Sequence, residues 1–230
     1  MTVNGAYFTP ALFAFLRELR DNNEKAWFQS NKDRYIADVR DPLLGFIADF
    51  GDHLGRISTQ FLADPRPVGG SMFRIYRDTR FSKDKSPYKT AASAHFRHAW
   101  GKDVHTPGFY LHLEPDLCFA GAGIWHPDAD TLARIRDTMV ADPASWKTAT
   151  SGKAFKAQWE LGGESLKRNP RGYDPDHPLI EDLKRKDFVC GASFTEEDAC
   201  APGFMRQFTD MCRTAVPFMR YLTTAMGAPW

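Results

Sequence analysis

The spacing of the apolar residues changes twice along the chain, and this change most limits the folds open to it. Apolar residues recur at helical spacing in the first third, alternate with polar residues in the middle third, and return to helical spacing in the last third. Helices and strands gather side chains on one face with different periods, so each third favours one type of element. The order predicts an α+β protein, with a mostly antiparallel central sheet packed against N- and C-terminal helices.

The helices are expected at both ends of the chain. One begins at Pro10, a second covers about 23–39, and a third begins at Asp41, which is followed by proline. Further helices are expected in the last third. The closing one spans 203–226, and Pro217 must kink or break it because proline lacks the backbone N–H.

The strands are expected within about 72–125. Alternation of apolar and polar residues predicts strands over 72–78 and 93–100. Two more are predicted near 109–113 and 117–120, joined by a turn at the sequence EPD. A sheet of neighbouring strands joined by short turns is expected to be antiparallel.

Length and composition favour one globular domain over residues 1–230. The chain is 43% hydrophobic, which is enough material for a core. No apolar run approaches the roughly 18–20 residues of a membrane span, and the first residues do not resemble a signal peptide. The four cysteines include no CxxC pair and are typical of reduced, buried thiols. We therefore expect a cytoplasmic protein with no membrane partner.

Positive charge is concentrated in residues 73–90, FRIYRDTRFSKDKSPYKT. This segment has six Lys or Arg against two Asp, a local net charge of +4, whereas the whole chain carries +1. The isoelectric point of 7.7 argues against a protein that binds duplex DNA through its overall charge. The positive charge is therefore a local feature, which calls for a local explanation.

One interpretation of the basic segment is a site for a phosphate-containing ligand or nucleic acid. Guanidinium groups bind phosphate or carboxylate oxygens in pairs, and lysines add charge. The expected anion-binding residues are Arg74, Arg77, Arg80, Lys85, Tyr88 and Lys89. Alternation along 72–78 places Arg77 on the apolar face, where a buried charge would need a partner. The other interpretation is that arginines and acids pair with each other and hold the loop.

A second group of polar residues lies in the predicted strand YLHLEP. Alternation places Tyr110, His112 and Glu114 on one face. A histidine beside a carboxylate can act as an acid–base pair or as two ligands of a divalent metal. It can equally be a hydrogen-bonded outer face without chemistry. Asp78, His112 and Glu114 are the catalytic candidates, and no residue is assigned to a metal.

The absent motifs narrow the possible classes of enzyme. The chain has no GxxxxGK[ST], GxGxxG, GxSxG or HExxH. These absences argue against a P-loop ATPase, a dinucleotide-binding fold, an α/β-hydrolase and a zincin. The sequence therefore identifies no cofactor.

The basic segment also resembles the defining motif of a known family, domain of unknown function 2461, found in bacteria and fungi. The matching positions are Arg74, Arg77, Asp78, Arg80, Phe81, Asp84, Lys85 and Tyr88, in the pattern RxxRDxRFxx[DN]KxxY. NNEKAWFQSNKDRY, PGFYLHLEP, GAGIW and RGYDPDHPLIEDLKRKDF resemble further blocks of the family. The resemblance implies a single domain of this length and carries no catalytic role, cofactor or substrate. The sequence departs from the family at Ala122, where a third glycine is expected.

Three functions remain open at this point. The first is an enzyme acting on a phosphorylated or nucleic-acid substrate, in which the motif cations neutralise phosphate and an acid or His112 transfers protons. The second is a binding module without catalysis, whose affinity falls with salt. The third is a structural or interaction protein in which the Arg/Asp motif stabilises the fold.

Overall fold

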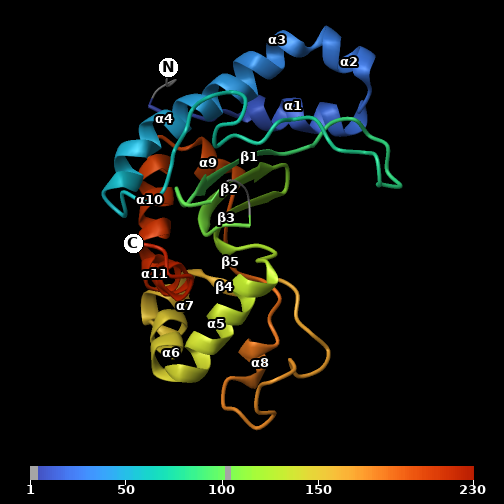
Figure 1. Ribbon diagram of the computed structural model, residues 1–230. Coiled ribbons are helices and arrows are strands. Elements are labelled where there is room, and N and C mark those ends of the chain that lie inside the picture. Colours follow the sequence, from blue (N-terminus) through green and yellow to red (C-terminus); the bar gives the residue numbers. More distant parts are fainter. Residues whose placement is uncertain (1–4, 102–104) are drawn as a thin grey trace.

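The computed structural model describes residues 5–101 and 105–230 (Figure 1). It confirms the α+β class, with N-terminal helices, a central antiparallel sheet and C-terminal helices. The N-terminal helices are α1 (Pro10–Asp21), α2 (Lys25–Ser30), α3 (Lys32–Arg34), the π-helical segment η1 (Tyr35–Arg40) and α4 (Asp41–Gly55). The single helix expected over 23–39 is therefore divided into α2, α3 and η1, with a break at Asn31.

The remaining helices lie in the C-terminal half of the chain, and some of them pack against α1 and α4. They are α5 (Ala129–Ala141), α6 (Pro143–Ser151), α7 (Lys153–Gln158), α8 (Ile180–Leu183), α9 (Glu196–Cys200), α10 (Phe204–Thr214) and α11 (Val216–Ala225). The expected break in the closing helix is present. Ala215 separates α10 from α11, and Pro217 lies in the first turn of α11, where proline loses no helical hydrogen bond.

The sheet has the strand order β1-β2-β3-β5-β4, and every neighbouring pair is antiparallel. Its strands are β1 (Ala92–Arg97), β2 (Gly108–Glu114), β3 (Leu117–Ile124), β4 (Glu160–Gly162) and β5 (Phe188–Phe194). The hairpin of β2 and β3 matches the predicted pair of strands. β4 and β5, however, lie outside the predicted window of 72–125.

The predicted strand over 72–78 is not a regular strand. This segment makes only isolated bridges, between Met72 and Ala94 and between Tyr76 and Tyr88. It starts along the free edge of β1 and then turns back on itself, so its backbone pairs with residues 87–89 and not with a continuous strand. Arg77 is consequently not sunk in the core as strict alternation predicted, and its guanidinium pairs with Asp84 near the surface.

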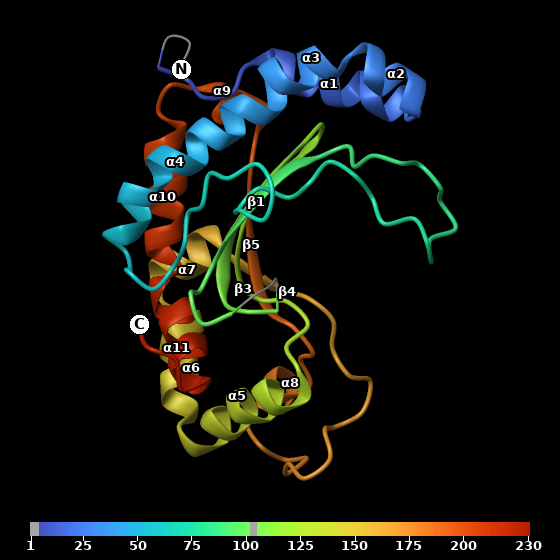
Figure 2. The ribbon, with the colours of Figure 1, turned by 45° about the horizontal axis from the view of Figure 1, so that its top comes forward.

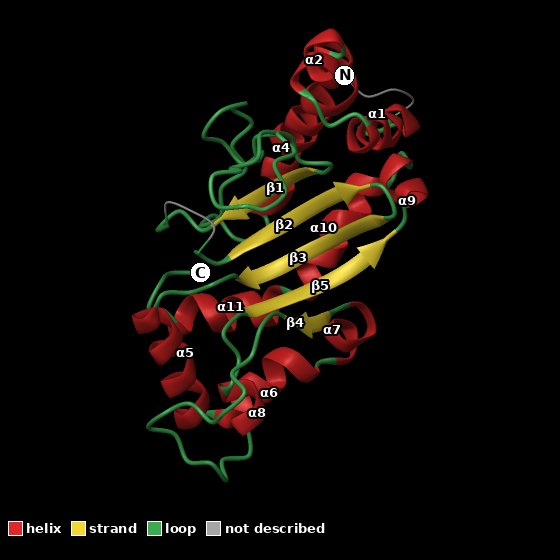
Figure 3. Cartoon of the chain, turned by 90° about the vertical axis from the view of Figure 1, so that its right-hand side faces the viewer, coloured by secondary structure: helices red, strands yellow, loops and turns green. Residues whose placement is uncertain are grey.

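One face of the sheet packs against helices and the other does not. α4, α10 and α11 lie together on one side (Figure 2). On this side Phe50, Phe96 and Phe208 pack ring against ring. Figure 3 looks onto the opposite face, across which none of the helices passes. In β2 the residues that point to the helices are buried, while Tyr110, His112 and Glu114 point to the other face and are only partly buried.

A close approach between β3 and β5 explains one glycine of the GAGIW segment. Gly123 has φ of +128°, and a Cβ there would lie 2.0 Å from the carbonyl oxygen of Phe188. Only glycine fits such a position without strain. Ala122, the departure from the family pattern, points to the helices and is buried, so a methyl group is accommodated there.

Two expectations from composition can be compared with the described residues. All four cysteines are free thiols, and Cys118, Cys190 and Cys212 are buried. None of the helices in the described part of the chain combines the length and apolarity needed to cross a membrane.

Candidate functional site

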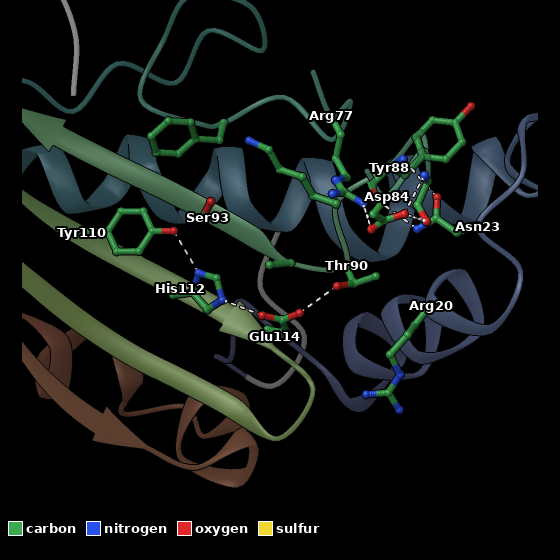
Figure 4. A pocket seen from close by; sticks show the side chains of 14 residues that line it. Arg20, Asn23, Arg77, Asp84, Tyr88, Thr90, Ser93, Tyr110, His112 and Glu114 are labelled. Carbon is green, nitrogen blue, oxygen red and sulfur yellow. Dashed lines mark hydrogen bonds and ion pairs between the residues drawn. The ribbon is translucent and has the colours of Figure 1, made fainter. Parts of the chain in front are cut away.

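A cleft of about 570 Å³ lies between the uncovered face of β1 and β2, the basic segment and the end of α1 (Figure 4). Of the predicted site residues, those that line it are Arg77, Tyr88, Lys89, His112 and Glu114. The cleft thus brings the HxE pair of β2 together with part of the basic motif, although the two are more than twenty residues apart in sequence.

Polar side chains form a continuous hydrogen-bonded line along β2. The hydroxyl of Tyr110 lies 2.8 Å from Nδ1 of His112, and Nε2 of His112 lies 3.0 Å from Oε2 of Glu114. The hydroxyl of Thr90 donates to Oε1 of Glu114 at 2.7 Å. Figure 4 shows Tyr110, His112 and Glu114 following one another on the same strand face. Their spacing of two residues is what places them side by side.

The partners determine where the protons lie. An ionised carboxylate only accepts hydrogen bonds, so Glu114 requires the proton of neutral His112 on Nε2. Nδ1 then accepts from the hydroxyl of Tyr110. Burial raises the pKa of Tyr110, an effect that a hydrogen bond from the Ser93 hydroxyl partly opposes. The ring of His112 also stacks on Phe119, with ring centres 4.7 Å apart, which fixes its plane.

Lys89 is the cation of the cleft that has no acid partner. Its Nζ lies 5.0 Å from the centre of the Phe73 ring, and this ammonium group donates no hydrogen bond to any residue in 5–101 or 105–230. Burial lowers the pKa of Lys89, and the nearby charge of Arg74 lowers it further. Lys89 is therefore a partly buried cation in the wall of the cleft.

Two arginines add positive charge to the cleft. Arg77 donates from Nη1 to Asp84, and the other N–H groups of its guanidinium donate to none of the described residues. Ser86 and Arg77 together hold the pKa of Asp84 well below its usual range. Arg20 comes from α1, and its nearest carboxylate oxygens are 3.8 and 3.9 Å away.

The remaining motif residues do not line the cleft. Arg80 pairs with Asp78 through two nitrogens, and 77% of its side chain is exposed. Lys85 donates to the carbonyl of Thr79 at 2.9 Å, and Arg74 is exposed. The motif residues therefore form two groups. One group lines the cleft, and the other makes contacts within the loop that carries it. Asp78, a predicted catalytic residue, belongs to the second group.

Tyr88 supports the wall of the cleft through its ring and its backbone. The ring is 2% exposed and stacks on Phe28, with centres 4.1 Å apart and planes at 18°. The side-chain amide of Asn23 accepts from the N–H of Tyr88 and donates to its C=O, both at 3.0 Å. Asn23 therefore pairs with this backbone as a neighbouring strand would.

Sequence reasoning did not assign Arg20, Asn23, Thr90, Ser93 or Tyr110 to the site. Tyr110 lies on the predicted polar face of its strand, so the alternation of that strand could have assigned it to the site. Thr90 is the last residue of the basic segment and Ser93 lies just beyond it, and no motif distinguishes either of them. Arg20 and Asn23 come from the end of α1, and nothing in a single sequence connects that helix end with β2.

Metal coordination was one interpretation of His112 and Glu114. Across residues 5–101 and 105–230, no group of three or more His, Cys, Asp and Glu side chains is placed to hold a metal ion. His112 and Glu114 instead bond to each other.

Fold and site together define an α+β protein with a sheet covered on one face only and a polar cleft on its open face. The sequence profile of one family, described as a conserved hypothetical protein (DUF2461), matches residues 11–221. The chain belongs to this family, as the resemblance in the sequence indicated. No curated protein and no solved structure matches the chain.

Proposed function

We propose that this protein is an enzyme that performs acid–base catalysis on a small substrate carrying phosphate or another anionic group. The observation that carries the proposal is the line from Tyr110 through His112 to Glu114, set in the wall of a cleft that also contains Lys89. A base oriented by a carboxylate next to a hydroxyl is the arrangement by which proteins activate hydroxyl groups.

In this proposal each member of the line has a separate role. Both nitrogens of His112 already have partners, so the phenol oxygen of Tyr110 is the atom that exchanges protons with the substrate. When the substrate gives a proton to this oxygen, the phenol passes its own proton to Nδ1 of His112. Glu114 then stabilises the imidazolium ion that forms. The reverse transfer returns the proton to the product.

The charges of the cleft favour a small anionic substrate over a nucleic acid. Lys89, Arg77 and Arg20 are the cations that line it, while Arg80 pairs with Asp78 away from it. A nucleic-acid groove usually presents a long track of free cations to successive phosphates. Lys89 and the free N–H groups of Arg77 are enough for one phosphate or carboxylate group.

Calorimetric titration with inorganic phosphate tests the anion site. Lys89→Met removes the unpaired cation, whereas Lys83→Met removes an equal charge from an exposed position in the same segment outside the cleft. We expect Lys89→Met to weaken phosphate binding by about tenfold or more, as for the loss of a charged hydrogen bond. Lys83→Met should change it little. Equal losses in both variants would indicate diffuse attraction to the segment and would contradict the site.

Catalysis is tested by a screen of phosphate esters and of anionic substrates with an acidic proton. In any reaction found, Tyr110→Phe and Glu114→Gln should lower kcat more than they alter KM, because they act on proton transfer. Thr131→Ala is a control that lies away from the cleft. A reaction whose kcat is unchanged in both variants would refute the roles of Tyr110 and Glu114 in proton transfer.

A specific observation also supports the alternative that the motif serves the fold. Arg77 pairs with Asp84 and Arg80 with Asp78, so two motif arginines stabilise the loop that bears them. Under this alternative, or under a binding module without catalysis, Tyr110→Phe would leave every measured function intact. If Arg80→Met abolishes phosphate binding while Lys89→Met does not, phosphate binds at the loop and not in the cleft.

A further inference from the structure

A second cavity, of about 580 Å³, adjoins the cleft on the same uncovered face of the sheet. The two share Phe73 and Tyr110 as a common wall. This second cavity extends across β3 toward β5 and β4, in the direction away from Glu114. We call it the apolar groove. Its volume falls in the range of about 300–1,000 Å³ typical of sites for small molecules.

The walls of the apolar groove are aromatic. Tyr110 has its ring centre 6.0 Å from that of Phe73 and 5.7 Å from that of Phe119. Trp125 lines the groove at the end of β3, and half of its surface is exposed. Exposed aromatic rings around a hollow on a sheet offer faces and edges to a flat apolar molecule.

The floor of the groove is bare backbone. Gly121 of β3 and Gly191 of β5 are opposite each other and point to the uncovered face. Packing explains Gly121, since a Cβ there would lie 3.2 Å from Cβ of Tyr110. It does not explain Gly191 or Gly162, where a Cβ would meet no atom within 4 Å and φ is not positive. Glycine in a strand often marks a place where a ligand comes close to the backbone.

We propose that the apolar groove and the cleft bind one small molecule, with a flat apolar ring over Gly121 and Gly191 and an anionic group beside Lys89. The inference rests on the proposed function and adds the class of substrate to it. Tyr110 faces both parts, because its ring lines the groove and its hydroxyl bonds to His112. The bond that joins the ring of the ligand to its anionic group would then lie beside the phenol oxygen of Tyr110, which exchanges protons in the proposed function.

Three probes separate the two parts of the ligand. They are naphthalene-1-phosphonate, which has ring and anion and is not hydrolysed, inorganic phosphate, which has the anion alone, and 1-naphthol, which has the ring alone. Removing an apolar ring from water is favourable, so we expect the phosphonate to bind at least about tenfold more tightly than phosphate. The phosphonate should also bind more tightly than 1-naphthol.

The decisive variant is Gly191→Leu, which places a side chain on the floor of the groove at a position where a Cβ would meet no atom within 4 Å. It should reduce the affinity for the phosphonate to that for phosphate and leave phosphate binding unchanged. Gly162→Val, on the neighbouring strand, serves as a second variant if the first unfolds. Gly203→Leu is the matched control, because Gly203 is exposed and its Cβ also meets no atom.

Each other outcome decides against one claim. If phosphate binds through Lys89 but Gly191→Leu leaves phosphonate binding intact, the inference is overturned and the proposed function stands. If no anion binds, the proposed function fails first. If 1-naphthol binds as tightly as the phosphonate, the groove accepts neutral molecules and the combined ligand is wrong. If the protein dimerises and Gly191→Leu abolishes the dimer, the groove is an interface between copies.

Discussion

The side chain of Asn23 pairs with the backbone of Tyr88 through two hydrogen bonds of 3.0 Å, one to its N–H and one to its C=O. The two residues are 65 positions apart in the chain. Asn23 belongs to the block NNEKAWFQSNKDRY, and Tyr88 is the last residue of the basic motif. This contact therefore joins two segments through which the chain resembles its family, and it fixes one wall of the cleft.

Asn23→Ala should destabilise the fold, because it leaves a partly buried N–H and C=O without their partner. We expect the free energy of unfolding to fall by about 1–3 kcal/mol. Asn22→Ala is the control, since the exposed side chain of Asn22 makes only a local bond to the carbonyl of Glu18, and we expect an effect within about 0.5 kcal/mol. Urea denaturation measures both. Equal effects would mean that the pairing with Tyr88 does not stabilise the protein.

The carboxyl group of Asp78 should titrate far below an ordinary aspartate. Hydrogen bonds from the side chain and the backbone of Arg80 lower the pKa of Asp78 to about 2. Because the pKa is lower in the folded state, this contribution to stability is present above the unfolded value of about 3.9 and is lost as the pH falls toward 2. Carboxyl NMR shifts measure the titration directly.

Arg80→Met should move the midpoint of Asp78 back toward the ordinary range. Arg74→Met is the comparison, since Arg74 makes no hydrogen bond to Asp78 and lowers its pKa only weakly, through its charge. A midpoint for Asp78 that both changes move equally would contradict the bidentate pair as the main cause.

His112 should exist as the Nε2–H tautomer when it is neutral. Glu114 accepts from Nε2, so the other tautomer would place an Nε2 without a proton against the carboxylate and break that bond. Nitrogen chemical shifts of the imidazole distinguish the two forms. His53, which is partly exposed near the end of α4, provides a histidine outside the cleft for comparison. An Nδ1–H form at His112 would rule out the proposed path of the proton.

Lys89 should have a pKa below the ordinary value of 10.5, because burial disfavours its charged form and Arg74 repels it. NMR of the dimethylated lysines measures this value. Arg74→Met should raise the pKa of Lys89 by removing the repulsion. Added phosphate should also raise it, since a bound anion favours the charged form. A value that phosphate leaves unchanged would show that the anion does not bind beside Lys89.

The sequence was most informative where a single local pattern determined the structure. Alternation and the EPD turn predicted β2 and β3, and the same alternation placed His112 beside Glu114. β5 was missed because its helix-facing positions include the small residues Cys190 and Ala192 between two phenylalanines, which weakens the apolar alternation.

The sequence was least informative about which motif cations are free. Arg80 pairs with an acid two residues before it and Arg77 with an acid seven residues after it. These spacings belong to an irregular loop, and no regular period predicts them. Lys89 is distinguished from its neighbours by the ring of Phe73 and the depth of the cleft, which depend on tertiary packing.

The one-sided sheet has a consequence for how substitutions would be tolerated along a single strand. In β5, Cys190 and Ala192 face the helices, whereas Gly191 between them faces the apolar groove. A saturation scan that scored cellular abundance and activity separately should thus show the two phenotypes alternating from one residue to the next. Larger side chains at the outer positions would leave abundance high while activity fell, and those at the inner positions would lower both.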